Sequence, residues 1–189
     1  MKMISVLWLV TALNVAGCAT IPMNFQPTYV EASTRKINAT LQHISVIPAG
    51  SDERISELPS SEVLHEIIPE WEKSLSDSMR KTGAFTSDAK DQANLLVTIL
   101  ELNIHRIGFS KSTDVTARYE IFNLTTGRSV YKTEISSRGV VPAGLAQPTQ
   151  GFSIRSGYNH SIESVNTAIR ENIEKFVWSF DGMPAPNEH

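Results

Sequence analysis

Three consecutive segments between Leu95 and Val140 have the two-residue period of β-strands, and this run constrains the fold more than any other feature of the chain. The alternation is clearest in the middle segment, where Val115, Ala117, Tyr119 and Ile121 alternate with Thr116, Arg118, Glu120 and Phe122. A turn at residues 123–127 leads into a return strand at about residues 128–140, with Gly127 where a positive φ is needed. One apolar face per strand is typical of an antiparallel sheet that helices cover on one side.

The first of these segments, Leu95–Ile107, is apolar on both faces as far as Leu100. Beyond that point the pattern places Leu100, Leu102 and Ile104 on one face, and Glu101, Asn103 and His105 on the other. This pattern predicts a central strand. A further strand is expected at about Ile37–Ile47, where Pro48 ends it.

Two segments have the period of a helix. In the first, Leu64, Ile67, Ile68, Trp71, Leu75 and Met79 share one face, and Gly83 lies just beyond the end. Pro69 leaves two alternatives: a helix kinked at Pro69, or a short turn that leads into a helix starting there. The second helix is expected from about Ser161 to Phe180, with Trp178 off its apolar stripe.

The order of elements is therefore strand, helix, three strands, helix. We expect an α+β fold, in which a mostly antiparallel four-stranded sheet has two helices packed on one face. The single α/β domain is predicted at residues 34–180, and residues 181–189, with Gly182, Pro184 and Pro186, are predicted to be a flexible tail.

The N-terminus has the three parts of a secretory signal peptide: a cation at Lys2, an apolar run at Ile4–Ala16, and small residues before Cys18. The run is too short and too polar for a transmembrane helix, which needs about 20 apolar residues. Val15-Ala16-Gly17-Cys18 resembles the lipobox of bacterial lipoproteins. The resemblance implies cleavage between Gly17 and Cys18, and acyl chains such as palmitate on Cys18. Residues 1–17 would then be the signal peptide, and residues 18–33 a lipidated cysteine and its tether.

In that family the residue after the cysteine influences sorting, and Ala19 in place of Asp implies the outer membrane, facing the periplasm. Cys18 is the only cysteine, so a lipidated mature chain has neither a thiol nor a disulfide. The formal net charge is −3, and cleavage removes only Lys2 from the charged residues. A mildly acidic chain without a basic run is not suited to nucleic acid.

The order of elements also resembles the lipopolysaccharide-assembly lipoprotein and transport-auxiliary lipoproteins of diderm bacteria. The resemblance rests on Cys18 before the first strand, on the helix end at residues 80–85, and on the turn at residues 123–127. It implies an architecture and, apart from Cys18, no functional residue.

No motif in the chain supports catalysis or a cofactor. Ser153 lacks the second glycine of a nucleophile elbow, and a pairing of Ser153 with His160 is of a kind that chance often produces. The five histidines are scattered without metal-ligand spacing, and no phosphate-binding loop occurs. We therefore expect a protein that is not an enzyme, without metal or cofactor.

The best functional candidate is a long loop expected at residues 142–160. Phe152, Ile154, Arg155 and Tyr158 combine aromatic, apolar and guanidinium groups, which are enriched where proteins dock. The alternative is that this loop only covers a sheet edge. We expect a membrane-anchored protein that binds another envelope component, in assembly or transport. A carrier of lipid in a sheet–helix cleft is the second hypothesis, and a cell-wall hydrolase the third.

Overall fold

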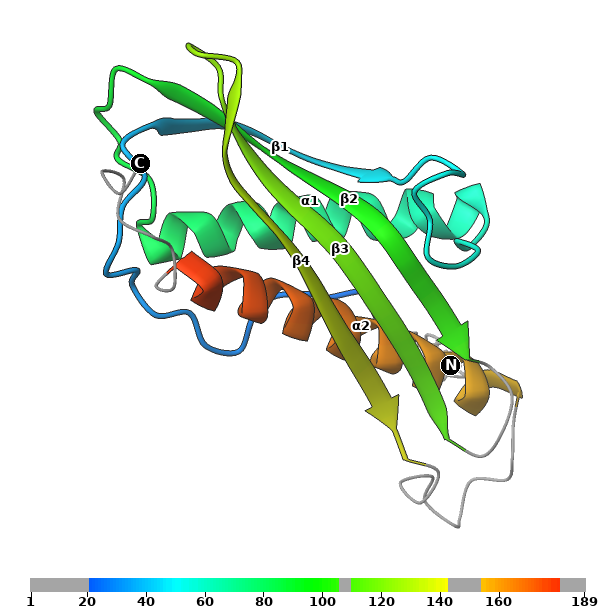
Figure 1. The fold of residues 1–189 in the computed structure, drawn as a ribbon. Helices are drawn as coiled ribbons and strands as arrows, with labels where there is room; N and C mark the ends of the chain where they lie inside the picture. Colours follow the sequence, from blue (N-terminus) through cyan, green and yellow to red (C-terminus); the bar gives the residue numbers. More distant parts are fainter. Residues whose placement is uncertain (1–20, 106–109, 143–153, 181–189) are drawn as a thin grey trace, which may run out of the picture.

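A computed structural model describes residues 21–105, 110–142 and 154–180, with side chains from residue 160 onward in the last range. The elements are β1 (Thr40–Pro48), α1 (Ser61–Thr82), β2 (Gln92–His105), β3 (Lys111–Asn123), β4 (Arg128–Val141) and α2 (Ile154–Ser179). Both helices lie on one face of the four-stranded sheet (Figure 1). The α+β class and the predicted order of elements are confirmed.

The strand order is β1-β2-β3-β4. β2 pairs with β3, and β3 with β4, in antiparallel fashion, whereas β1 is parallel to β2 because α1 carries the chain back between them. A bulge between Ile99 and Glu101 interrupts the pairing of β2 with β3. Leu100 is therefore buried outside the main core cluster that holds Ile99 and Leu102, and its expected alignment with Leu102 was wrong.

The hairpin between β3 and β4 follows the sequence pattern. Asn123 Oδ1 accepts hydrogen bonds from the backbone N–H groups of Thr125 and Thr126. Gly127 has a φ of 67°, a conformation in which a Cβ atom is strained. These two residues close the turn that the sequence predicted.

α1 is one continuous helix from Ser61 to Thr82, with Pro69 inside it. Proline lacks the N–H that would bond the carbonyl of His65, four residues earlier. Both residues are exposed, so water can take the place of the missing donor. Solvent exposure thus accounts for a proline in the middle of this helix.

α2 begins at Ile154, seven residues before the expected start at Ser161. The loop predicted over residues 142–160 is therefore wrong from Ile154 onward. Gly157 lies inside the helix, where a glycine costs about 1 kcal/mol relative to alanine and does not by itself end a helix. The apolar stripe of α2 and its contact with the sheet outweigh that cost.

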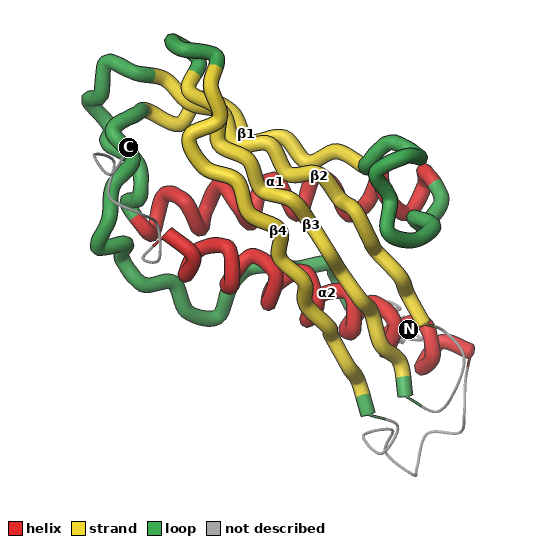
Figure 2. The backbone as a smooth tube through the Cα atoms, in the orientation of Figure 1, coloured by secondary structure: helices red, strands yellow, loops and turns green. Residues whose placement is uncertain are grey.

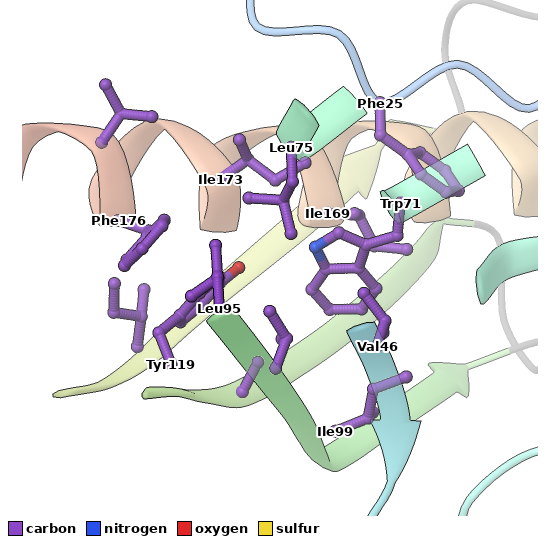
Figure 3. Packing of buried hydrophobic residues seen from close by; sticks show 14 of the residues in the cluster. Phe25, Val46, Trp71, Leu75, Leu95, Ile99, Tyr119, Ile169, Ile173 and Phe176 are labelled. Carbon is purple, nitrogen blue, oxygen red and sulfur yellow. The ribbon is translucent and has the colours of Figure 1, made fainter. Parts of the chain in front are cut away.

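The core lies between the sheet and the two helices (Figure 3). Trp71 from α1 and Tyr119 from β3 are fully buried, as the sequence predicted for Trp71. Tyr119 stacks on Phe176 of α2, with ring centroids 4.0 Å apart. Trp178, off the stripe, is 54% exposed.

The chain before β1 contributes to this core. Residues 22–28, which we call the strap, lie along α2 and reach α1 (Figure 2). Phe25 is fully buried beside Trp71, and Pro27 is also buried. This part of the range 18–33 is packed against the helices, and only the residues before Pro22 could serve as the expected tether on that side.

Asn166 of α2 holds the strap by both ends of its amide. Its Oδ1 accepts the N–H of Asn24 at 3.0 Å, and its Nδ2 donates to the carbonyl of Pro22 at 3.1 Å. Further along, Glu174 accepts the N–H of Thr28, and Asp77 of α1 accepts the amide of Gln26. The strap therefore runs in the same direction as α2.

Candidate functional site

Several residues singled out by the sequence lie outside the described part of the chain. Gly17, Cys18 and Phe152 are among them. Ile154, Arg155 and Tyr158 lie in the first turns of α2, where only the backbone is described. The structure places these three residues on a helix instead of a loop.

The face of the sheet opposite the helices, which we call the outer face, is the main candidate surface considered in the described chain (Figure 1). Arg118 of β3 lies near its centre. Its guanidinium donates to Glu134 on β4 at 2.9 Å and to Glu53 at 3.2 Å. The hydrogen bond to Glu134 raises the pKa of Arg118, so this group stays cationic.

A second set of polar contacts lies toward the other end of the outer face. Asp114 of β3 meets His105 Nε2 at 2.7 Å and Arg138 Nε at 3.5 Å. Between the two sets, Thr116 donates to Glu101 at 3.1 Å and lies 3.0 Å from the hydroxyl of Ser136. On the outer face, charged and polar side chains of β2, β3 and β4 thus form pairs between neighbouring strands.

An open groove of about 410 Å³ runs from the outer face around β4 toward α2. Glu101, Asp114 and Arg138 line it on the sheet, and Glu171 and Lys175 line it on the helix. Its lining therefore offers both carboxylates and cations. Such a groove suits a polar partner that carries charges of both signs.

A helix side chain bonds the backbone of each edge strand. Lys175 of α2 donates to the carbonyl of Ser136 on β4 at 2.9 Å. Glu72 of α1 accepts the N–H of Val46 on β1 at 2.9 Å. Each of these bonds occupies a backbone N–H or carbonyl that a strand added to that edge of the sheet would need for pairing. The outer face is therefore a more accessible docking surface than the two edges.

The described grooves give little support to a lipid carrier. A groove of about 400 Å³ lies between β1 and α1, the kind of cleft this hypothesis requires. Gln42, His43, Glu72, Lys73 and Ser76 line most of it. An acyl chain is expected in an enclosed apolar cavity, which this open polar groove does not resemble.

The described residues bring together no catalytic or metal-binding set. No group of three or more His, Cys, Asp or Glu side chains in this part of the chain could hold a metal ion. No described helix is long and apolar enough to cross a membrane. Ser153, whose pairing with His160 the sequence analysis attributed to chance, lies outside the described residues.

Sequence reasoning missed two asparagines of α2, Asn166 and Asn172. Asn172 is fully buried between Tyr119 and β4, and Asn166 holds the strap. The available signal was a polar residue next to the apolar stripe of the helix. That signal indicates a buried hydrogen bond without identifying its partner.

No protein-family model matches the chain. No curated protein matches it either. The comparison with solved structures finds similar folds: a protein of the DUF330 family from Xanthomonas campestris is 12% identical, with a TM-score of 0.50. That match covers 82% of this chain and 94% of the other. It shows that the two proteins share a fold.

Bacterial lipoproteins are among the similar structures. A minor lipoprotein from Acinetobacter baumannii is 12% identical, with a TM-score of 0.47, over 78% of this chain and 93% of the other. PelC from Paraburkholderia phytofirmans, which is a dodecamer, is 11% identical, with a TM-score of 0.44. The match covers 82% of this chain and 96% of the other.

Proposed function

We propose that this chain is a non-catalytic lipoprotein, anchored by acyl chains on Cys18 to the outer membrane, whose outer sheet face binds another envelope component. The observation that carries the proposal is the outer face itself. Helices cover one face of the sheet, and the other carries charged side chains that ion pairs with Arg118 and Asp114 hold in place. The segment after β1 covers part of this face, where Ile55 bonds the carbonyl of Leu100, and the rest is open. Fixed charges favour specific recognition because little conformational entropy is lost on binding.

The anchor supports this role through local concentration. Two or three acyl chains hold a protein on a membrane far more firmly than a single chain does. A partner in the same envelope then meets the outer face at a high effective concentration, so a modest affinity suffices. Envelope assembly or transport is the setting in which such a presenting domain is useful.

The segment at Phe152, Ile154, Arg155 and Tyr158 is the second surface included in the proposal. The backbone of Ile154, Arg155 and Tyr158 lies in the first turns of α2, which contacts the start of β3 further along through Ser164 and Thr113. Aromatic residues and arginine are enriched where proteins dock, which is why the proposal includes this segment.

Photo-crosslinking in the native envelope tests the proposal. A crosslinkable residue replaces Glu134 or Arg138 on the outer face in two variants, and Arg155 in a third. The matched control replaces Trp178, which is exposed on α2 away from the outer face. We expect one protein adduct of defined mass from the outer-face positions and none from Trp178.

Each other result has a definite meaning. No adduct at any position contradicts partner binding, and an adduct at Arg155 alone moves the interface to the start of α2. A Cys18→Ala variant should lose membrane association and most of the adduct. If it remains on the membrane, the proposed anchor is wrong, whatever the crosslinking shows.

A further inference from the structure

We infer that Glu101 of β2 receives a lysine or arginine side chain of a partner protein, in the groove that runs from the outer face around β4 toward α2. The inference rests on the function proposed above. It adds the chemistry by which the partner is recognised at this surface. Three features of Glu101 carry it: the charges around it, the donors it has, and the way the strand presents it.

The other charged groups that line the groove are paired with one another. Arg138 pairs with Asp114 at 3.5 Å, and Lys175 pairs with Glu171 at 2.8 Å. Glu101 lines the same groove and forms no ion pair with the described residues. The lining therefore has one carboxylate more than it has cations, and that carboxylate is Glu101.

Glu101 also differs from the other half-buried carboxylates of the described chain. Each of those has a cation, a backbone N–H or a side-chain amide as its partner; they are Glu70, Glu72, Asp77, Asp91, Asp114, Glu120, Glu171 and Glu174. Within the described residues, Glu101 has only the hydroxyl of Thr116, at 3.1 Å. A cation that reaches a carboxylate partly withdrawn from water forms a charge-assisted hydrogen bond, which is stronger than a neutral one.

Two hydroxyl groups hold the carboxylate in place. Glu101, Thr116 and Ser136 lie opposite one another on β2, β3 and β4, which run side by side (Figure 1). Thr116 has one hydroxyl proton and donates it to Glu101, so Ser136 is the donor in its 3.0 Å contact with Thr116. This chain of hydrogen bonds ends on one carboxylate oxygen of Glu101. The other oxygen has no donor in the described part of the chain.

The bulge in β2 brings Glu101 to the outer face. Residues two apart on a regular strand share a face, and Ile99 is buried in the core. In the bulge, Ile99 and Glu101 lie opposite the adjacent residues Ala117 and Thr116 of β3. Glu101 therefore shares the outer face with Thr116 instead of pointing into the core with Ile99. Bulges often redirect a side chain in this way beside functional sites.

A protein side chain suits this position better than a lipid headgroup. Arg138 is two strands and two residues away from Glu101, which places their Cα atoms about 12 Å apart. A protein surface can match both groups with separate side chains in fixed positions, as specific recognition requires. In an ethanolamine headgroup the ammonium and the phosphate are joined through two carbon atoms only, too short a spacing to meet both groups.

Removal of the charge at Glu101 in the native envelope tests the inference. The parent chain carries the crosslinkable residue at position 134, and the yield of protein adduct is measured before it saturates. Glu101→Gln keeps the size of the side chain and its acceptor for Thr116. We expect the yield to fall roughly tenfold in Glu101→Gln. Glu101→Lys, which repels the incoming cation, should abolish the adduct.

Glu120→Gln is the matched control. Glu120 is a half-buried carboxylate on the outer face of β3, but Lys132 lies 3.9 Å from it. The adduct yield should stay at the parent level in this variant. An equal loss in Glu120→Gln and Glu101→Gln would show that the partner responds only to the overall charge of the face, and would overturn the role of Glu101.

The remaining results separate the inference from the proposed function. Full yield from Glu101→Gln overturns the inference and leaves the proposed function standing, whereas no adduct from the parent chain overturns both. An adduct with lipid in place of protein overturns the inference as well. The melting temperature of each full-length variant is measured in detergent. If Glu101→Gln melts well below the parent, Glu101 is a structural residue and the inference is wrong.

A charge exchange then identifies the cation. Mass spectrometry of the parent adduct locates the contacting segment of the partner, and each lysine and arginine of that segment is replaced by glutamate in turn. One replacement should restore the adduct with the Glu101→Lys chain. If none restores it, Glu101 has no cationic counterpart in the partner and the inference fails.

Discussion

The hydroxyl of Tyr119 donates a 2.7 Å hydrogen bond to Oδ1 of Asn172, at the centre of the interface between the sheet and α2. The Nδ2 of the same asparagine donates to the carbonyl of Ile135 and to the hydroxyl of Ser137. Ser137 in turn donates to the carbonyl of Ala168. A continuous buried network thus links β3, β4 and α2 and fixes how the helix lies on the sheet.

Tyr119→Phe should lower the free energy of unfolding by about 1–2 kcal/mol, since it leaves Oδ1 of Asn172 buried without its donor. Asn172→Ala should cost more, because three partners lose their bonds. Urea unfolding of both variants and of the double variant measures the coupling between them. Additive effects would contradict a shared network.

Alkaline pH should destabilise the protein through Tyr119. Burial raises the pKa of this phenol far above its ordinary value of 10. Above pH 10 the unfolded chain loses the proton while the folded chain keeps it, so stability falls by about 1.4 kcal/mol per pH unit for this group. Below pH 10 both states keep the proton and the contribution is constant.

The difference between wild type and Tyr119→Phe isolates this effect from the other groups that titrate in the same range. Unfolding free energies measured from pH 8 to pH 11 should converge above pH 10. Parallel profiles would mean that Tyr119 ionises in the folded state.

Gly139→Ala should destabilise the fold, although alanine usually suits a strand better than glycine. A Cβ atom at residue 139 would lie 2.1 Å from the carbonyl oxygen of Ser164 and 2.6 Å from the backbone N of Ala168. Either α2 or β4 must move, at a cost of about 1–3 kcal/mol. Val140→Ala, at a neighbouring residue that is 49% exposed, is the control and should change the melting temperature little.

Phe25→Ala should release the strap and lower stability by about 3 kcal/mol, within the range for removal of a buried phenylalanine. Tyr29, four residues later, is 63% exposed, so Tyr29→Ala should have little effect. Hydrogen exchange of the amides of Asn24 and Thr28 reports on the strap directly. Exchange at the wild-type rate in Phe25→Ala would show that hydrogen bonds hold the strap without this side chain.

Arg118→Ala should separate binding from stability. Its two ion pairs lie at the surface, where such pairs contribute about 0.2–1 kcal/mol each. The free energy of unfolding should therefore change little. The yield of the crosslinked adduct should fall in the variants that carry the crosslinkable residue at position 134 or 138. Lys73→Ala, which removes an exposed ion pair on α1, is the matched control and should leave crosslinking intact.

Local patterns were enough to predict most elements. Alternation in β3 and β4, the Asn123–Gly127 turn and Gly83 after α1 all act within a few residues, so their physics is visible in sequence. Two predictions failed, one at the start of α2 and one at Leu100. α2 begins at Ile154 instead of Ser161. The bulge between Ile99 and Glu101 places Leu100 outside the main core cluster. Neither outcome follows from the local propensity of the residues.

The amino-acid sequence by itself determined the elements, their order and the lipobox-like Cys18, because periodicity and motif are properties of neighbouring residues. Only the tertiary structure decided that Asn166 hydrogen-bonds Pro22 and Asn24, and that Asn172 hydrogen-bonds Tyr119. The same holds for the close approach of the α2 backbone to Gly139. These pairs are separated by about 25 to 145 positions in the chain, and one sequence does not record which distant residues share a core. The strap, which the sequence predicted to be part of a tether, belongs to the domain because Phe25 is buried in the core and Asn166 bonds Pro22 and Asn24.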